Sequence, residues 1–171
     1  MRGYVQVYTG NGKGKTTAAL GIALRAAGHG LRVYIAQFCK KQTCGEHIAL
    51  KKLKGFITIK QFGTGKFIKG KPSAKDIKNA QKGFLESLTA IFSGKYDIVI
   101  LDEMNDAVSI GLIDVERVAE AIDSKPDEIE LIITGRNASK KIIQRADLVT
   151  DMREIRHYYK NGVKARKGIE Y

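Results

Sequence analysis

Hydrophobic and polar positions alternate in the first segment of the chain and then give way to glycines. Residues 4–8 read Tyr-Val-Gln-Val-Tyr, an alternation rich in β-forming side chains that predicts a strand. Residues 16–27 contain one glycine and no proline, which favours a helix that stops at Gly28-His29-Gly30. Residues 31–38 form a second predicted strand. The order strand, glycine-rich loop, helix, strand predicts a βαβ unit, whose crossover is almost always right-handed.

Strands and helices keep alternating through the rest of the chain. Residues 73–93 predict a helix, because Ser73 and Asp76 have capping-box spacing and the apolar residues share one face. Residues 96–101 are apolar on both faces, which is typical of a central parallel strand. The other expected elements are strands at 56–62, 130–134 and 148–152, helices at 114–123 and 139–145, and a hairpin around Asn161-Gly162. This pattern predicts a three-layer α/β domain with a mostly parallel central sheet, and one domain over residues 1–171.

The glycine-rich segment between the first strand and helix carries the strongest chemical signal. A turn of this kind aims several backbone N–H groups at one point, where the helix dipole adds positive charge, and phosphate is the natural occupant. Lys15 supplies a full charge to the terminal phosphates, and Thr16 can offer its hydroxyl to a magnesium ion. The predicted triphosphate loop consists of Gly10, Asn11, Gly12, Lys13, Gly14, Lys15, Thr16 and Thr17. A P-loop domain of the RecA-like kind is therefore expected.

The spacing within this loop departs from the usual pattern. Four residues normally separate the first glycine from Gly-Lys-Ser/Thr, but Gly10 and Gly14 enclose only three, and strict matching would place the first glycine at Thr9. The loop is one residue shorter than the usual pattern and has a second lysine, Lys13. We hypothesise that it seats a nucleotide differently from an ordinary NTPase.

Two further groups are expected near the phosphates. Asp102-Glu103 follows the central strand, and carboxylates at the carboxyl end of such a strand usually face the ligand crevice, so they fit the acidic partner of magnesium. Arg136 ends a neighbouring strand at Thr134-Gly135-Arg136. It is placed either to hold the terminal phosphate with its guanidinium fork or to form a surface salt bridge.

Charge and composition narrow the class of protein. The formal net charge is +12, the isoelectric point is near 9.7, and lysines recur from Lys51 to Lys82. A solvated lysine-rich face explains this better than a nucleic-acid track, because few aromatic residues are interleaved. No apolar run could cross a bilayer and no signal peptide precedes the first strand, so a cytoplasmic protein without a membrane partner is expected.

The two cysteines leave a choice of roles. Cys39, Cys44 and His47 could hold a metal, but a structural zinc site needs a fourth ligand and none lies at a suitable spacing. Free thiols are the preferred interpretation.

The motifs together resemble the P-loop ATP:corrinoid adenosyltransferases, which make adenosylcobalamin. The resemblance runs nearly end to end, and the short loop and the Gly-Ile-Glu-Tyr ending are its most specific parts. It rests on residues 9–19, 25–30, 37–38 with 45–46, 101–103, 134–136, 146–150 and 162–171.

The resemblance implies a reaction in which a cobalt(I) corrinoid attacks the ribose 5′ carbon of ATP and expels triphosphate. It implies ATP, Mg²⁺ and a corrinoid as ligands, with Lys15, Thr16 and Glu103 as catalytic residues and Thr16 and Glu103 around the metal. Arg25 and Arg136 would add contacts to the nucleotide. A flavodoxin-like electron donor and a homodimer are also implied.

Phe67 is matched to the family's aromatic residues on the lower face of the corrinoid, with Ile68 and Phe62 as weaker substitutes and core packing as the alternative. Two other functions compete with the resemblance. One is a RecA-like or kinase-like ATPase acting on nucleic acid, and the other is a module that binds nucleotide without turnover.

Overall fold

The centre of the protein is a sheet of six parallel strands. A computed structural model describes residues 2–65, 68 and 70–171, and every recorded strand pairing in it is parallel. The strand order is β3-β2-β4-β5-β1-β6. The strands are β1 (Val5–Thr9), β2 (Val33–Gln37), β3 (Ile57–Gln61), β4 (Ile98–Asp102), β5 (Glu130–Thr134) and β6 (Leu148–Asp151). The prediction of a mostly parallel sheet is confirmed.

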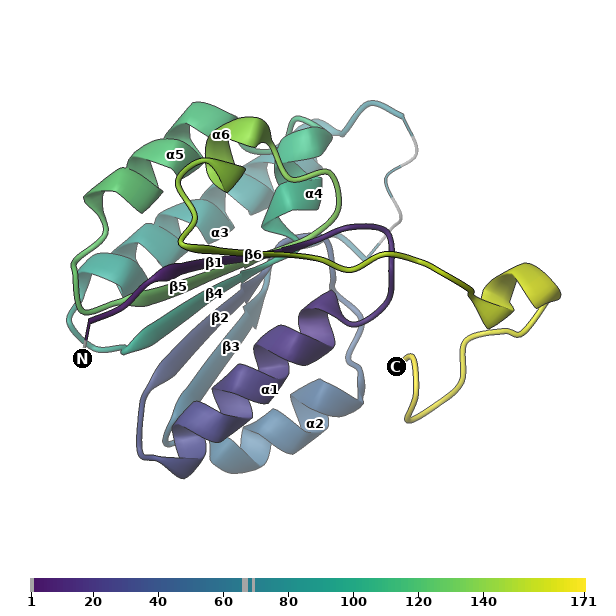
Figure 1. Cartoon of the computed structure of the whole chain (residues 1–171), viewed down its shortest axis with the longest axis horizontal. Coiled ribbons are helices and arrows are strands. Elements are labelled where there is room, and N and C mark those ends of the chain that lie inside the picture. The colour runs from purple at the N-terminus through teal and green to yellow at the C-terminus, as the bar shows by residue number, and fades with distance from the viewer. Residues whose placement is uncertain (1, 66–67, 69) are drawn as a thin grey trace.

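Helices cover both faces of the sheet, as Figure 1 shows. On one face lie α1 (Lys15–Gly28) and α2 (Gly45–Leu50), which leads into the short 3-10 helix η1 (Lys51–Leu53). On the other face lie α3 (Ala74–Phe92), α4 (Met104–Ser109), α5 (Val115–Ser124) and α6 (Lys140–Ile143). The predicted three-layer α/β fold is confirmed. None of the helices in the described ranges combines the length and apolar composition that crossing a bilayer requires.

Each face of the sheet has its own hydrophobic core. Along β2, Val33 and Ile35 join the cluster beneath α1, whereas Tyr34 and Ala36 join the cluster beneath α3. All residues of β2, β4 and β5 are buried, which explains why these strands are apolar at consecutive positions. Burial on both faces makes the middle of the sheet a rigid base for the loops at its carboxyl edge.

Three local features differ from the sequence-based expectation. The helices α2 and α4 were not predicted, because both are six residues long and too short to show a periodic pattern. The hairpin expected around Asn161-Gly162 is wrong. Residues Tyr158–Asn161 form the 3-10 helix η2, and Gly162, with a φ of 81°, ends it in the left-handed conformation. Asn-Gly serves here as a helix stop, which uses the same backbone freedom as a turn.

The strand order brings three connections together at the carboxyl edge of the sheet. Because β5 lies between β4 and β1, the residues at the carboxyl ends of β4, β5 and β1 are neighbours. These are the acidic pair, the Thr-Gly-Arg segment and the glycine-rich loop. Beyond β6, the chain leaves the sheet and returns toward the amino-terminal end of α1 (Figure 1).

Candidate nucleotide site

The glycine-rich loop connects β1 to α1 at this edge. Gly10 and Gly14 have φ angles of 95° and 118°, which side chains rarely adopt, so the turn requires glycine at both positions. The N–H of Gly12 donates to the carbonyl oxygen of Met152 at 2.6 Å, and a Cβ at Gly12 would lie 2.6 Å from that oxygen. A side chain at Gly12 would therefore clash with the backbone of Met152. The hydrogen bond between these two residues also fixes the loop to the chain that follows β6.

Lys15 folds back over the loop from the first turn of α1. Its Nζ donates to the carbonyl oxygens of Gly10 and Gly12, each at 2.7 Å. Burial, and then the positive charge of Arg136, lower the pKa of Lys15. A bound anion would stabilise this ammonium, so Lys15 and the amino terminus of α1 together make a site suited to phosphate.

Asp102, the last residue of β4, is buried at 1% exposure and fully hydrogen-bonded. Its Oδ1 accepts from Thr16 Oγ1 at 2.8 Å and from Thr134 Oγ1 at 2.7 Å. Its Oδ2 accepts from Gln37 Nε2 at 3.0 Å. Asp102 is thus the carboxylate that contacts the loop directly, whereas the sequence reasoning favoured the following residue, Glu103.

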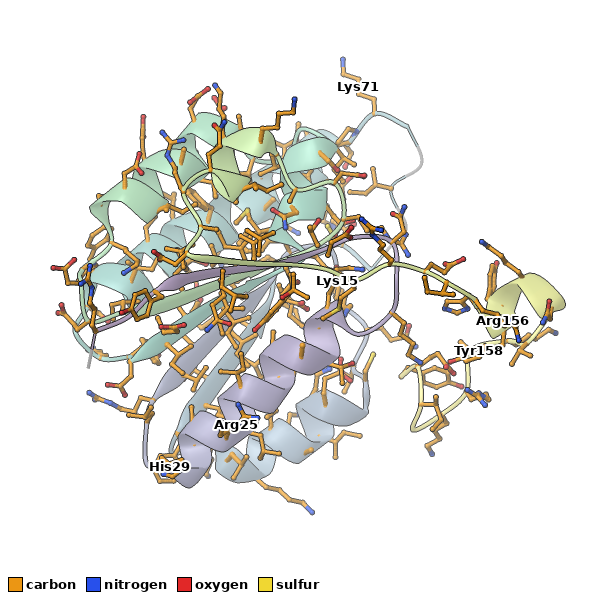
Figure 2. The ribbon with its side chains drawn as sticks, in the orientation of Figure 1. Lys15, Arg25, His29, Lys71, Arg156 and Tyr158 are labelled. Carbon is orange, nitrogen blue, oxygen red and sulfur yellow. The ribbon has the colours of Figure 1, made fainter. Side chains whose placement is uncertain are left out.

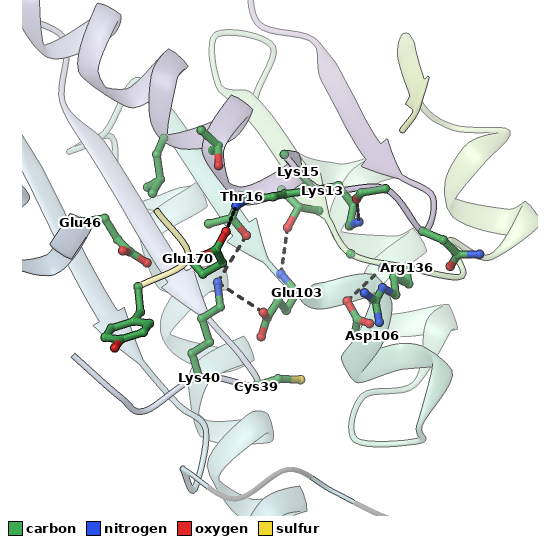
Figure 3. Close-up of a pocket in the computed structure, with 18 of the residues that line it drawn as sticks. Lys13, Lys15, Thr16, Cys39, Lys40, Glu46, Glu103, Asp106, Arg136 and Glu170 are labelled. Atoms are coloured by element: carbon green, nitrogen blue, oxygen red, sulfur yellow. Dashed lines mark hydrogen bonds and ion pairs between the residues drawn. The ribbon is translucent and has the colours of Figure 1, made fainter. Parts of the chain in front are cut away.

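Glu103 adopts a φ of 63° at the start of α4, an unusual value for a residue with a side chain. Its Oε1 lies 3.4 Å from Lys40 Nζ. Burial raises the pKa of Glu103 to about 6, and the charge of Lys40 offsets only part of this effect. Lys40 Nζ is also 3.6 Å from Asp102 Oδ2 and 3.4 Å from Thr16 Oγ1. One ammonium therefore lies among three side chains that carry oxygen ligands. Two of them, Glu103 and Thr16, are labelled beside Lys40 in Figure 3.

The residues around Lys40 fit a magnesium ion. Mg²⁺ prefers carboxylate and hydroxyl oxygens, which Asp102, Glu103 and Thr16 provide within reach of one another. The ammonium of Lys40 shows that this position favours positive charge. Nothing in the sequence marks Lys40 as a site residue, because it reaches Asp102 and Glu103 only through the packing of β2 beside β4.

Arg136 lines the same pocket from the segment after β5. Its backbone N–H donates to Asp106 Oδ2 at 3.0 Å. Gly135 has a φ of 127°, and a Cβ there would lie 2.5 Å from the same carboxylate oxygen. Asp106 therefore fixes the turn that carries the Arg136 guanidinium. The sequence offered one clue to Asp106, which lies three residues beyond Glu103 on α4.

The pocket itself has a volume of about 850 Å³. Its polar end is formed by the loop and the groups just described, and apolar side chains contribute to its remaining wall. Of the sequence-predicted residues, those from Asn11 to Thr17, Glu103 and Arg136 line it, and Gly10 shapes the loop behind it. The apolar residues are Leu20, Ile68, Ile110 and Ile169.

One predicted ligand contact is not brought together with the others. Arg25 lies on α1 ten residues beyond Lys15, roughly 15 Å along a helix axis, and does not line the pocket. Figure 2 shows Arg25 near the opposite end of α1 from Lys15. The rise of the helix separates Arg25 from the loop, and the sequence motif alone does not show this distance. Phe67 lies outside the described residues.

The cysteines do not form the metal centre considered above. Cys44, Glu46 and His47 cluster, with candidate ligand atoms within 4.8 Å of one another. Both ring nitrogens of His47 are already engaged: Nδ1 accepts from the Cys44 N–H at 2.9 Å, and Nε2 lies 2.7 Å from Gln37 Oε1. Burial raises the pKa of Cys39 to about 12, so its thiol stays protonated. Neither Cys39 nor Cys44 is part of a disulfide.

The fold and the loop define a class of protein: a P-loop nucleotide-binding protein with a RecA-like parallel sheet. Among solved structures, the flagellar accessory protein FlaH from Methanocaldococcus jannaschii shares this fold, with a TM-score of 0.56 at 12% identity, over 86% of this chain and 70% of that one. Residues 1–171 match the family model described as ATP:corrinoid adenosyltransferase BtuR/CobO/CobP. The chain belongs to this family.

Curated relatives agree with the family match. A corrinoid adenosyltransferase of Pseudomonas aeruginosa is 33% identical over 171 residues, which is 99% of this chain and 84% of the relative. A corrinoid adenosyltransferase of Escherichia coli K12 is 34% identical over 170 residues, 99% of this chain and 86% of the relative. The activity is therefore that of an ATP:corrinoid adenosyltransferase, a transferase with ATP and a corrinoid as substrates. The nucleic-acid ATPase alternative finds no support.

Proposed function

We propose that the pocket holds ATP with its triphosphate on the glycine-rich loop as a leaving group. In the family's reaction, the electron pair of cobalt(I) forms a carbon–cobalt bond at the ribose 5′ carbon while the bond from that carbon to the triphosphate oxygen breaks. The observation that supports this arrangement is that Lys15, Lys40 and Arg136 all line the pocket that the glycine-rich loop borders. Positive charge there stabilises the charge that develops on the departing triphosphate.

Mg²⁺ is part of the proposal, with Thr16, Asp102 and Glu103 as the residues that would hold it. Bound there, it would add positive charge beside the triphosphate. Thr16 and Asp102 are already fixed to each other by their 2.8 Å hydrogen bond, so the oxygen ligands need little rearrangement. The ammonium of Lys40 would turn from the carboxylates to a phosphate oxygen, which keeps its charge paired.

The chain's remaining contribution is to orient the substrates and exclude water. No side chain has to act as nucleophile, because the corrinoid cobalt does so. The apolar wall formed by Leu20, Ile110 and Ile169 would limit water near the reduced cobalt. We further propose that residues 1–171 act as one domain and form a homodimer. A flavodoxin-like protein is the proposed reductant, and Phe67 is proposed to face the corrinoid.

The test is to incubate the protein with ATP, magnesium and chemically reduced cobalamin. Light-sensitive adenosylcobalamin and free triphosphate are expected in equal amounts. Lys15→Ala should lower the rate by at least about a hundredfold, the effect typical of removing a transition-state donor. Lys71→Ala is the matched control, since Figure 2 shows this lysine at an exposed loop away from Lys15. Formation of ADP without any dependence on corrinoid would refute the proposal.

A further inference from the structure

A carboxylate near the end of this sequence is bound by two nearby residues, Tyr158 and Arg166, and by one from the other end of the sequence, Lys13. Glu170 Oε1 accepts from Lys13 Nζ at 2.8 Å and from the hydroxyl of Tyr158. Glu170 Oε2 accepts from the Arg166 N–H at 2.7 Å and from its Nε at 3.3 Å. These hydrogen bonds hold the pKa of Glu170 well below its usual range. Of the residues that bind the Glu170 carboxylate, Lys13 is the one that belongs to the glycine-rich loop.

The donors of Lys13 are directed at the same segment. Besides Glu170, its Nζ donates to the Tyr158 hydroxyl at 3.0 Å and to the Ile169 carbonyl oxygen at 3.4 Å. An ammonium has three N–H donors, and each has an acceptor here. Lys15 contrasts with it, because its Nζ stays over the loop. The two lysines of the loop therefore have different partners (Figure 3).

The segment that Lys13 holds is also part of the pocket. Gly168, Ile169, Glu170 and Tyr171 line it together with the loop. The turn they form is closed by a hydrogen bond of 2.7 Å from the Gly168 N–H to the Tyr171 carbonyl oxygen. A segment with exposed residues and one charged attachment point can open locally at low cost.

We propose that residues 166–171, here called the closing segment, form a movable wall of the substrate pocket, and that Lys13 anchors this wall through Glu170 instead of binding phosphate. The pair makes Glu170 a positioning residue for the reaction. When it is intact, Ile169 and Tyr171 lie against the substrates and keep water out. When it breaks, the pocket opens beside the triphosphate and the product can leave. This inference rests on the proposed function for one point, the identity of the ligands as ATP and a corrinoid.

The chain contains no tryptophan, so Tyr171→Trp introduces a single tryptophan on the closing segment, whose fluorescence can be excited selectively over that of the tyrosines. Acrylamide quenching of this reporter in nucleotide-free protein measures how open the segment is. In that background, Glu170→Gln and Lys13→Met should each shift the open-to-closed ratio about twofold to fivefold, the range for exposed ion pairs. The double variant should be less open than the sum of the two single effects predicts, because the two variants share the contact between Lys13 and Glu170. Lys167→Met, an exposed lysine of the same segment, is the matched control and should leave quenching unchanged.

ATP affinity separates an anchor from a phosphate ligand. Lys13→Met should weaken ATP binding by the same small factor as Glu170→Gln, whereas Lys15→Ala should abolish it. The proposal is overturned if Lys13→Met abolishes ATP binding while quenching stays at the parent value. Additive effects of Lys13→Met and Glu170→Gln on quenching would also overturn it. The quenching measurement needs no turnover, so failure to form adenosylcobalamin would count against the proposed function and not against the anchor.

Discussion

Glu103→Gln should make the protein free of metal and nucleotide more stable at pH 8. Burial raises the pKa of Glu103 from 4.5 to about 6, even though Lys40 lies 3.4 Å away. A factor of ten in proton affinity is worth about 1.4 kcal/mol, so the ionised carboxylate costs the folded state about 2 kcal/mol. This cost is present above pH 6 and absent below pH 4.5, where the carboxyl is protonated in both the folded and the unfolded chain. Glutamine has nearly the shape of the neutral acid and tests the charge alone.

Urea unfolding in the presence of a chelator measures the effect. At pH 8 the free energy of unfolding of Glu103→Gln should exceed that of the parent by about 2 kcal/mol, and the difference should shrink toward zero as the pH falls from 6 to 4.5. Glu128→Gln changes an exposed glutamate and should show no such trend. If Glu103→Gln is less stable than the parent at pH 8, the ion pair with Lys40 outweighs the burial of the carboxylate, and the argument fails.

Two further substitutions test the cation position and the core. Lys40→Gln should tighten Mn²⁺ binding to the nucleotide-free protein by about tenfold, because its ammonium no longer competes between the carboxylates. Electron paramagnetic resonance titration with Mn²⁺ measures the affinity. Lys41→Gln removes the same charge from an exposed neighbour and serves as the control. Equal effects of the two substitutions would contradict the competition between Lys40 and the metal ion. Gly83→Ala should destabilise the protein by about 1–3 kcal/mol, since its Cβ would lie 2.4 Å from the Phe62 ring. Gly21→Ala on α1 meets no atom within 4 Å and should stabilise the protein by about 0.5–1 kcal/mol in urea unfolding, so a loss of stability there would contradict the helix-propensity argument.

The sequence predicted where the strands and long helices lie along the chain, because each of these elements carries a local signal. The Ser73 cap and the apolar stripe placed α3 within one residue of its observed ends. Short elements lack such a signal: α4 follows Glu103, whose positive φ depends on the surrounding packing. Asn161-Gly162 shows a different limit, since the same dipeptide serves either a hairpin or the end of a helix.

The candidate site was predictable where its residues are contiguous. The glycine-rich loop is a local motif, and its residues from Asn11 to Thr17 line the pocket. Lys40 and Glu170 reach the site from distant parts of the sequence, through the register of β2 on β4 and the return of the chain after β6. Their roles depend on tertiary contacts, which a motif does not encode.

The brace between Gly12 and Met152 has a consequence for how the protein is made. A ribosome synthesises the glycine-rich loop first and reaches its brace only 140 residues later. At about 5–20 residues per second, the loop waits several seconds or more for the contact that shapes it. ATP binding should therefore appear late during synthesis, after β6 has joined the sheet beside β1. Nucleotide would then stabilise the completed chain and contribute little to the folding of its first half.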